Sequence, residues 1–184
     1  MPHSLIVGGT ESGKTTLAVR LAAIYKAQNI KVIVLDPMLD QRWCADVLTT
    51  DPDFFLSIVR NPKTRSCALF IDESGETVGR YKDHMFWLAT RARHYGHNSH
   101  FISQRATQIA KTVRDQCRHL FLFSTSLMDC KALSDDFNEK GLLQGNLLEQ
   151  GEYFHITRWD KDLTKHSIFE DNIIQQDPQA EQED

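Results

Sequence analysis

The segment GGTESGKT, residues 8–15, matches the phosphate-loop pattern G-x-x-x-x-G-K-[ST] at every fixed position. Glycines let consecutive backbone N–H groups turn toward one anion, and the following helix adds the partial positive charge of its N-terminus. The pattern places the Lys14 ammonium on the outer phosphates of a nucleoside triphosphate and the Thr15 hydroxyl on a Mg²⁺ ion. It predicts a nucleotide site formed by Gly8, Gly9, Thr10, Glu11, Ser12, Gly13, Lys14, Thr15 and Thr16.

An acidic pair ends a short apolar run about 60 residues further on, in CALFIDES. The run reads as a buried strand, and a carboxylate directly after it can reach the metal beside Thr15. Asp72 is therefore predicted to bind Mg²⁺, and Glu73 to orient and polarise the water that attacks the γ-phosphate. The alternative is that the pair belongs to a solvated turn.

The segment SHFISQRATQ, residues 99–108, delivers an amide and a guanidinium at the end of another short strand. Ligands of parallel sheets bind at the carboxyl ends of the strands, so Gln104 is expected at the same edge as the phosphate loop and Glu73. Its amide can donate to a γ-phosphate oxygen and accept from the attacking water. Gln104 would then sense whether the γ-phosphate is present and transmit this to Arg105. The alternative is an amide that only caps the next helix.

The elements that must position these residues alternate between strands and helices, as in a parallel α/β sheet. Apolar runs predict strands at 4–9, 31–36, 67–72, 100–103 and 118–125. Helical patterns occupy 14–28, 39–60 in two pieces broken near 51–53, 81–95 ended by Gly96, 107–117 and 128–139. Residues 152–159 and 165–169 are predicted to form an edge hairpin.

The composition fits one compact domain, with 184 residues of which 41% are apolar and 25% charged. The formal net charge of −4 argues against a protein that coats nucleic acid by bulk positive charge. Residues 170–184 hold six acidic residues and no Lys or Arg. They are interpreted as a disordered acidic tail after a motor domain at 1–169.

Neither a membrane span nor a secretory signal is predicted, because no apolar run approaches about 18 residues and the N-terminus MPHSLIV lacks a basic region. The expected location is the cytoplasm. The four cysteines are scattered without a CxxC pair, which indicates neither a zinc site nor a disulfide framework.

The order of these motifs resembles the motor domain of the FtsK–HerA ATPases over residues 5 to about 157. The resemblance rests on the phosphate loop, the strand ending in DE, RARHYGHNSHFISQR, RHLFLF and LLEQGEYF. Members of that superfamily carry an Arg three residues before a Gly, then a strand and TQRP; Arg93, Gly96 and Gln104-Arg105 keep this spacing, while Ser103 and Ala106 depart from it. The implied fold is a P-loop NTPase of the ASCE, RecA/FtsK-like class, with a mostly parallel central sheet flanked by helices.

A bare motor of this size, without a β-barrel, membrane anchor or DNA-reading winged helix, is similar to the genome-packaging ATPases of membrane-containing, double-jelly-roll viruses such as tectiviruses. The resemblance implies hydrolysis of ATP with Mg²⁺ by a ring, a hexamer, that drives double-stranded DNA into a capsid at one vertex. Partners would be capsid vertex or portal proteins, in the host cytoplasm or on the virion. By the same likeness, Arg118 or Arg93 would reach the next subunit's ATP site.

Three alternatives stay open. A nucleoside or nucleotide kinase has this size and a phosphate loop, yet does not explain Glu73 together with Gln104. A filamentous-phage assembly ATPase of the zonula-occludens-toxin type shares the ATPase half but carries a membrane span. A plasmid-mobilisation or repair motor fits the same motifs.

Overall fold

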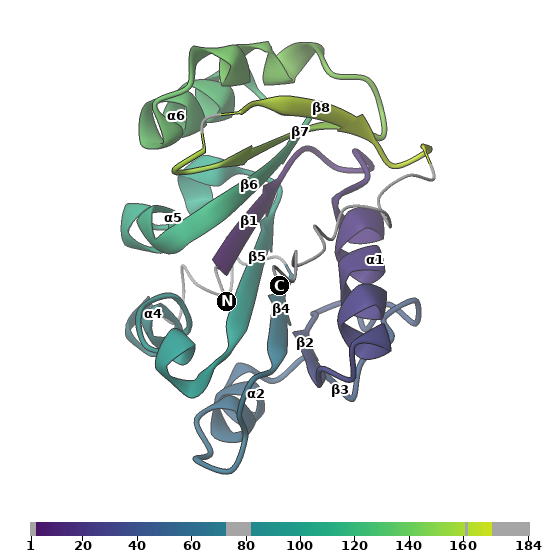
Figure 1. Cartoon of the computed structure of the whole chain (residues 1–184), viewed down its shortest axis with the longest axis vertical. Coiled ribbons are helices and arrows are strands. Elements are labelled where there is room, and N and C mark those ends of the chain that lie inside the picture. Colours follow the sequence, from purple (N-terminus) through teal and green to yellow (C-terminus); the bar gives the residue numbers. More distant parts are fainter. Residues whose placement is uncertain (1–2, 73–81, 161, 171–184) are drawn as a thin grey trace, which may run out of the picture.

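In the described part of the chain, the central sheet has eight strands in the order β3-β2-β4-β5-β1-β6-β7-β8 (Figure 1). The computed structural model describes residues 3–72, 82–160 and 162–170. Neighbouring strands run parallel from β3 to β6, and the last two pairs, β6-β7 and β7-β8, are antiparallel. The strands are β1 His3–Val7, β2 Val32–Leu35, β3 Val47–Thr49, β4 Ala68–Ile71, β5 Asn98–Ser103, β6 Cys117–Phe123, β7 Glu152–Thr157 and β8 Thr164–Ser167. The predicted α/β sheet with an edge hairpin is confirmed.

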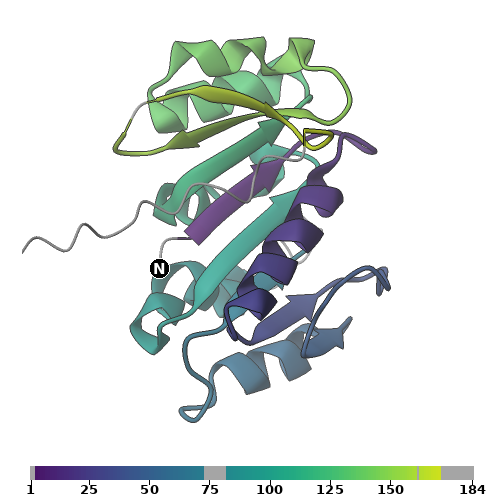
Figure 2. The same ribbon diagram turned by 45° about the vertical axis from the view of Figure 1, so that its right-hand side comes forward.

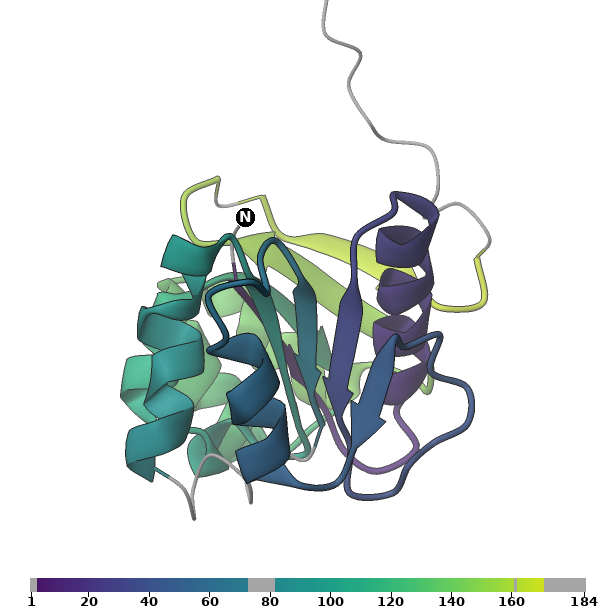
Figure 3. The same cartoon turned by 90° about the horizontal axis from the view of Figure 1, so that it is seen from below.

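Helices cover the two faces of the sheet unequally (Figures 2 and 3). One face packs on α1, Lys14–Ala27. The other packs on α2 Pro52–Val59, α4 Lys82–Thr90, α5 Lys111–Gln116 and α6 Leu127–Phe137. The described residues also form short 3₁₀ helices: η1 Ala92–Tyr95, η2 Ala106–Gln108 and η3 Lys140–Leu147.

The central strands are apolar on both sides because each face is covered. Successive residues of β2 and β4 alternate between two cores: Ile33 and Leu69 join the core under α2, α4, α5 and α6, whereas Val34 and Phe70 join the core under α1. Strands buried in this way read as continuous apolar runs, which is why the sequence located them.

The first half of the predicted helix over 39–60 is wrong. Residues 39–50 form turns and the strand β3, and only 52–59 is helical. The Asp36 carboxylate accepts hydrogen bonds from the backbone N–H groups of Met38 and Asp40, both at 2.8 Å, and from the Trp43 indole at 3.0 Å. Such side-chain bonds to nearby backbone favour turns over a helix.

The ends of other elements shift by a few residues. The predicted helix over 107–117 is divided into η2 and α5, and η1 separates α4 from Gly96, whose φ of 75° ends that segment. Within the described part of the chain, no helix is both long and apolar enough to cross a bilayer.

Candidate active site

The phosphate loop lies between β1 and α1, at the carboxyl edge of the parallel strands. Gly13 is the residue before α1, and no acidic residue occupies the first turn of this 14-residue helix. Its N-terminal N–H groups therefore retain the partial positive charge that binds anions. The loop is tied to the strands on both sides of β1: the Gly8 N–H donates to the Ser103 carbonyl at 3.3 Å, and the Gly9 N–H to the Ser124 carbonyl at 2.7 Å.

Lys14 folds back over this loop. Its ammonium donates to the Gly9 carbonyl at 2.6 Å, and only 8% of the residue is exposed. Thr15 and Thr16 follow it in the first turn of α1 and are half-buried. The loop thus holds a cation above a helix N-terminus, which suits a polyphosphate.

The C-terminal hairpin supports the loop from the side, a contact that the sequence did not predict. The Gly151 N–H donates to the Ser12 carbonyl at 3.0 Å, and the Gln150 amide donates to the Glu11 carbonyl at 3.0 Å. Arg20 of α1 donates to the Ile168 carbonyl at 2.5 Å. No local pattern could have indicated these bonds, because Gln150 and Glu11 lie 139 residues apart.

Two glycines permit this contact. Gly13 has φ 112° and Gly151 has φ 84°, both in the region that favours glycine. A Cβ atom on Gly13 would lie 2.9 Å from Ile168 Cδ1 and 3.5 Å from Gly151 Cα. The second glycine of the phosphate-loop pattern is therefore required here by the hairpin as well as by the turn.

Gln104 reaches the phosphate loop. It follows β5, the strand beside β1, and its side-chain oxygen accepts a hydrogen bond from the Thr10 hydroxyl at 3.2 Å. The next residue, Arg105, contacts the buried Asp129 carboxylate with its Nε atom at 3.4 Å. Gln104 therefore joins the loop on one side and the start of α6 on the other through its neighbour.

Asp72 lies at the same edge, directly after β4, and is 9% exposed. Its N–H donates to the Leu35 carbonyl at 2.9 Å, which continues the sheet to that point. A carboxylate and the Thr15 hydroxyl are hard oxygen donors of the kind that Mg²⁺ takes alongside phosphate oxygens, so the donor set fits this ion. Glu73, the predicted water-activating residue, lies outside the described residues.

Arg93 and Arg118 lie at the other edge of the sheet. Both line a pocket of about 310 Å³, together with His3, Asp115, Gln116, Cys117, Arg158 and Trp159. Arg118 is the second residue of β6, which runs parallel to β1, so the strand carries it roughly 17 Å away from the phosphate-loop end. Its guanidinium lies 3.7 Å from the Asp160 carboxylate; the Arg118 side chain is 47% exposed and the Asp160 side chain 70%. Arg118 therefore lies at the opposite edge of the sheet from its own phosphate loop.

Burial lowers the pKa of the His3 imidazole, also at this pocket, to about 4, with Arg93 as a further cause. His3 is therefore neutral near pH 7. Positive charge in the pocket comes from its arginines.

Comparison with known proteins shows similarity in three dimensions only. No protein-family model matches the chain, and no curated protein matches it. The genome packaging NTPase B204 of Sulfolobus turreted icosahedral virus 2, solved with AMPPCP, superposes with a TM-score of 0.71 at 18% identity, covering 90% of this chain and 97% of that one. The pCW3 conjugation coupling protein TcpA gives 0.67 at 15% identity, covering 90% and 59%, and VirB4 of Thermoanaerobacter pseudethanolicus gives 0.67 at 10%, covering 88% of each. The chain shares the fold of these proteins, a mostly parallel sheet flanked by helices, as the motifs predicted.

Proposed function

We propose that this chain is an ATP-hydrolysing motor that moves double-stranded DNA, and that it packages a viral genome. The observation that carries the proposal is the hydrogen bond between Thr10 of the phosphate loop and Gln104. It brings a neutral amide to the phosphate loop of a chain whose fold matches a packaging NTPase over nearly all of that protein. A sensor of this kind is needed where hydrolysis must be coupled to movement.

The residues at the carboxyl edge divide the chemistry. Lys14 exchanges the Gly9 carbonyl for phosphate oxygens, and the N–H groups at the start of α1 bind the same anion. A Mg²⁺ ion held by Thr15 and Asp72 would neutralise charge that develops on the phosphates. Glu73 acts as the general base, which polarises the attacking water and accepts its proton, and Gln104 orients that water.

The position of the arginine pocket supports a ring of subunits. Arg118 and Arg93 lie at the edge opposite to their own phosphate loop, so they serve the site of an adjacent copy if subunits pack head to tail. A guanidinium supplied in this way contributes on the order of 10³-fold in rate. We propose a hexamer that acts on DNA at a capsid vertex in the host cytoplasm, with capsid or portal proteins as partners.

A plasmid-mobilising motor is the second candidate, because the fold also matches the conjugation coupling protein TcpA. Both motor readings share the chemistry and differ in the partner that recruits the ring.

The test is the rate of ATP hydrolysis with and without double-stranded DNA, alongside the mass of the oligomer. We expect DNA to stimulate hydrolysis in a ring and the Lys14→Ala variant to show neither basal nor stimulated activity. Hydrolysis that ignores DNA, or that requires a nucleotide as phosphate acceptor, would contradict the proposal and favour the kinase.

A further inference from the structure

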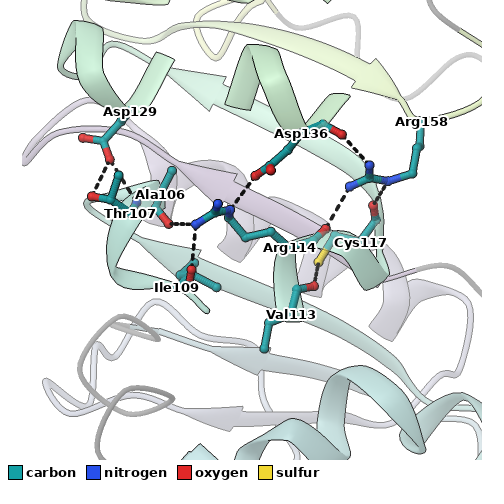
Figure 4. Close-up of polar contacts among 9 residues, drawn as sticks. All are labelled: Ala106, Thr107, Ile109, Val113, Arg114, Cys117, Asp129, Asp136 and Arg158. Atoms are coloured by element: carbon teal, nitrogen blue, oxygen red, sulfur yellow. Dashed lines mark hydrogen bonds and ion pairs between the residues drawn. The ribbon is translucent and has the colours of Figure 1, made fainter. Parts of the chain in front are cut away.

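Arg158, directly after β7, uses its whole guanidinium to hold three backbone carbonyls (Figure 4). Its Nε donates to Cys117 at 3.2 Å, Nη1 to Asp136 at 2.6 Å and Nη2 to Arg114 at 3.0 Å. Its backbone N–H also donates to the carbonyl of Arg118 at 2.8 Å. One residue thus joins the end of α5, the end of α6 and the first two residues of β6.

Arginine is the only side chain that can make this set of bonds. Its planar fork carries five donors in fixed directions, whereas lysine has one nitrogen on a flexible stem. The guanidinium lies over the Phe137 ring, 4.4 Å from its centre, which fixes the plane of the fork. The carbonyl end of α6 adds partial negative charge that favours a cation here.

A second arginine connects this cluster to the turn after Gln104. Arg114 of α5 donates from Nη1 to the carbonyls of Ala106 at 3.0 Å and Ile109 at 2.8 Å, and from Nε to the Asp136 carboxylate at 2.5 Å (Figure 4). The Arg114 and Asp136 side chains are 11% and 4% exposed. Removing either partner would leave a buried charge unpaired, so the arrangement is strongly specified.

The turn is held from its other side by α6. The Asp129 carboxylate accepts from the N–H and the hydroxyl of Thr107, both at 3.0 Å, and from the Ser126 hydroxyl at 2.6 Å. A short run of directional polar bonds therefore connects the carboxyl edge of the sheet, where Gln104 lies, to the amino edge, where Arg118 lies.

We infer that Arg158 is a positioning residue for Arg118, and that Arg114 ties this positioning to the turn that follows Gln104. The inference rests on the proposed function, in which Arg118 serves the ATP site of the next subunit. Arg158 would then act at a neighbour's site through Arg118, while its own subunit's phosphate loop stays intact. A displacement of about 1 Å in a group that must meet a transition state can cost on the order of 10²-fold in rate.

The experiment uses rings mixed from two variants. Arg158→Lys retains a complete phosphate loop but supplies a misplaced Arg118, whereas Lys14→Ala lacks a working site but supplies a correct Arg118. We expect Arg158→Lys alone to bind ATP as the wild type does and to hydrolyse it roughly 10²-fold more slowly. Mixed with Lys14→Ala in rings shown by mass to contain both, it should recover up to about a quarter of the wild-type rate, the share of head-to-tail interfaces with both halves intact.

Arg65→Lys is the matched control. Arg65 also stacks on a ring, 4.5 Å from the centre of Tyr95, and also donates to backbone carbonyls, those of Pro62 and His94, but it does not line the arginine pocket. Its replacement should leave hydrolysis within about two-fold of the wild type, because changes at surface positions away from a site are usually small. An equal loss in Arg65→Lys would overturn the specific role of Arg158.

Three further outcomes would also overturn the inference. The first is full activity of Arg158→Lys, and the second is weakened binding of ATP by this variant. The third is that Lys14→Ala restores hydrolysis in rings mixed with Arg118→Ala but not in rings mixed with Arg158→Lys. If Arg118→Ala itself is not rescued, the proposed action between subunits fails, and the role of Arg158 fails with it. Should Arg158→Lys not fold, Arg158→Gln is measured in the same mixture and judged by the same outcomes.

Discussion

Replacing His100 should make the free energy of unfolding less sensitive to a decrease in pH. This histidine of β5 is buried, its ring stacks on Phe70 with centres 4.4 Å apart, and its Nδ1 atom bonds to the Ser4 hydroxyl. Burial lowers the pKa of His100 to about 3, with His3 and His119 as lesser causes. The unfolded chain, whose histidine pKa is about 6.5, therefore binds the proton more readily than the folded chain between about pH 3 and 6.5. The free energy of unfolding keeps its full value above this window and falls as the pH is lowered through it.

As long as the pH stays well above 3, the loss of unfolding free energy depends only on the histidine pKa of the unfolded chain. From pH 6.5 to pH 5 the loss is 1.5 units at about 1.36 kcal/mol each, or about 2 kcal/mol. The variant His100→Phe keeps a ring on Phe70 and removes the titrating group. Its free energy of unfolding should therefore fall about 2 kcal/mol less than that of the wild type between pH 8 and pH 5.

Urea unfolding at the two pH values, followed by circular dichroism, measures this difference. Contributions from other titrating groups are shared by both proteins and cancel in the comparison. The control is Ser4→Ala, which removes the hydrogen-bond partner and retains the histidine, so it should keep the acid sensitivity of the wild type. Equal losses in His100→Phe and the wild type would refute the burial of a neutral imidazole at this position.

Further variants test the candidate site. Lys14→Ala should lose ATP binding and hydrolysis, whereas Glu73→Gln should bind ATP and fail to turn it over; a Glu73→Gln protein with a normal rate, measured by phosphate release, would remove Glu73 from the mechanism. Gln104→Ala should bind ATP almost normally and lose the stimulation of hydrolysis by DNA; if only its melting temperature falls, the helix-cap interpretation is correct. Gly151→Ala should lose about 1–2 kcal/mol of stability, because its φ of 84° is left-handed. It should also bind ATP more weakly, because a shift of the strained backbone would move the N–H that donates to the Ser12 carbonyl. An unchanged melting curve and affinity would show that the hairpin can shift without consequence.

The sequence revealed those parts of the fold that depend on local pattern. Buried strands read as apolar runs, and the phosphate loop is contiguous, so GGTESGKT was recognisable by itself. The expectation that Gln104 shares an edge with the phosphate loop followed from one rule of parallel sheets, and the structure places the two within hydrogen-bonding distance.

The parts that depend on contacts between distant residues escaped prediction. Asp36 directs the chain into turns where composition favoured a helix, and its three hydrogen bonds cannot be deduced from apolar periodicity. Arg158 was overlooked because its partners are backbone carbonyls, which leave no trace in the residue types around it. The support of Ser12 by Gly151 is invisible for the same reason.

The hairpin that supports the phosphate loop is synthesised long after the loop itself. Glu11 of the phosphate loop is synthesised 139 residues before Gln150, and the bonds that brace the loop and the helix α1 come from Gln150, Gly151 and Ile168. A growing chain emerges from the ribosome at about 5–20 residues per second, so the loop waits several seconds for this brace. A nascent chain paused before Gln150 therefore has its complete nucleotide-binding motif without the hairpin that supports it, and translation itself delays the moment at which the site matures.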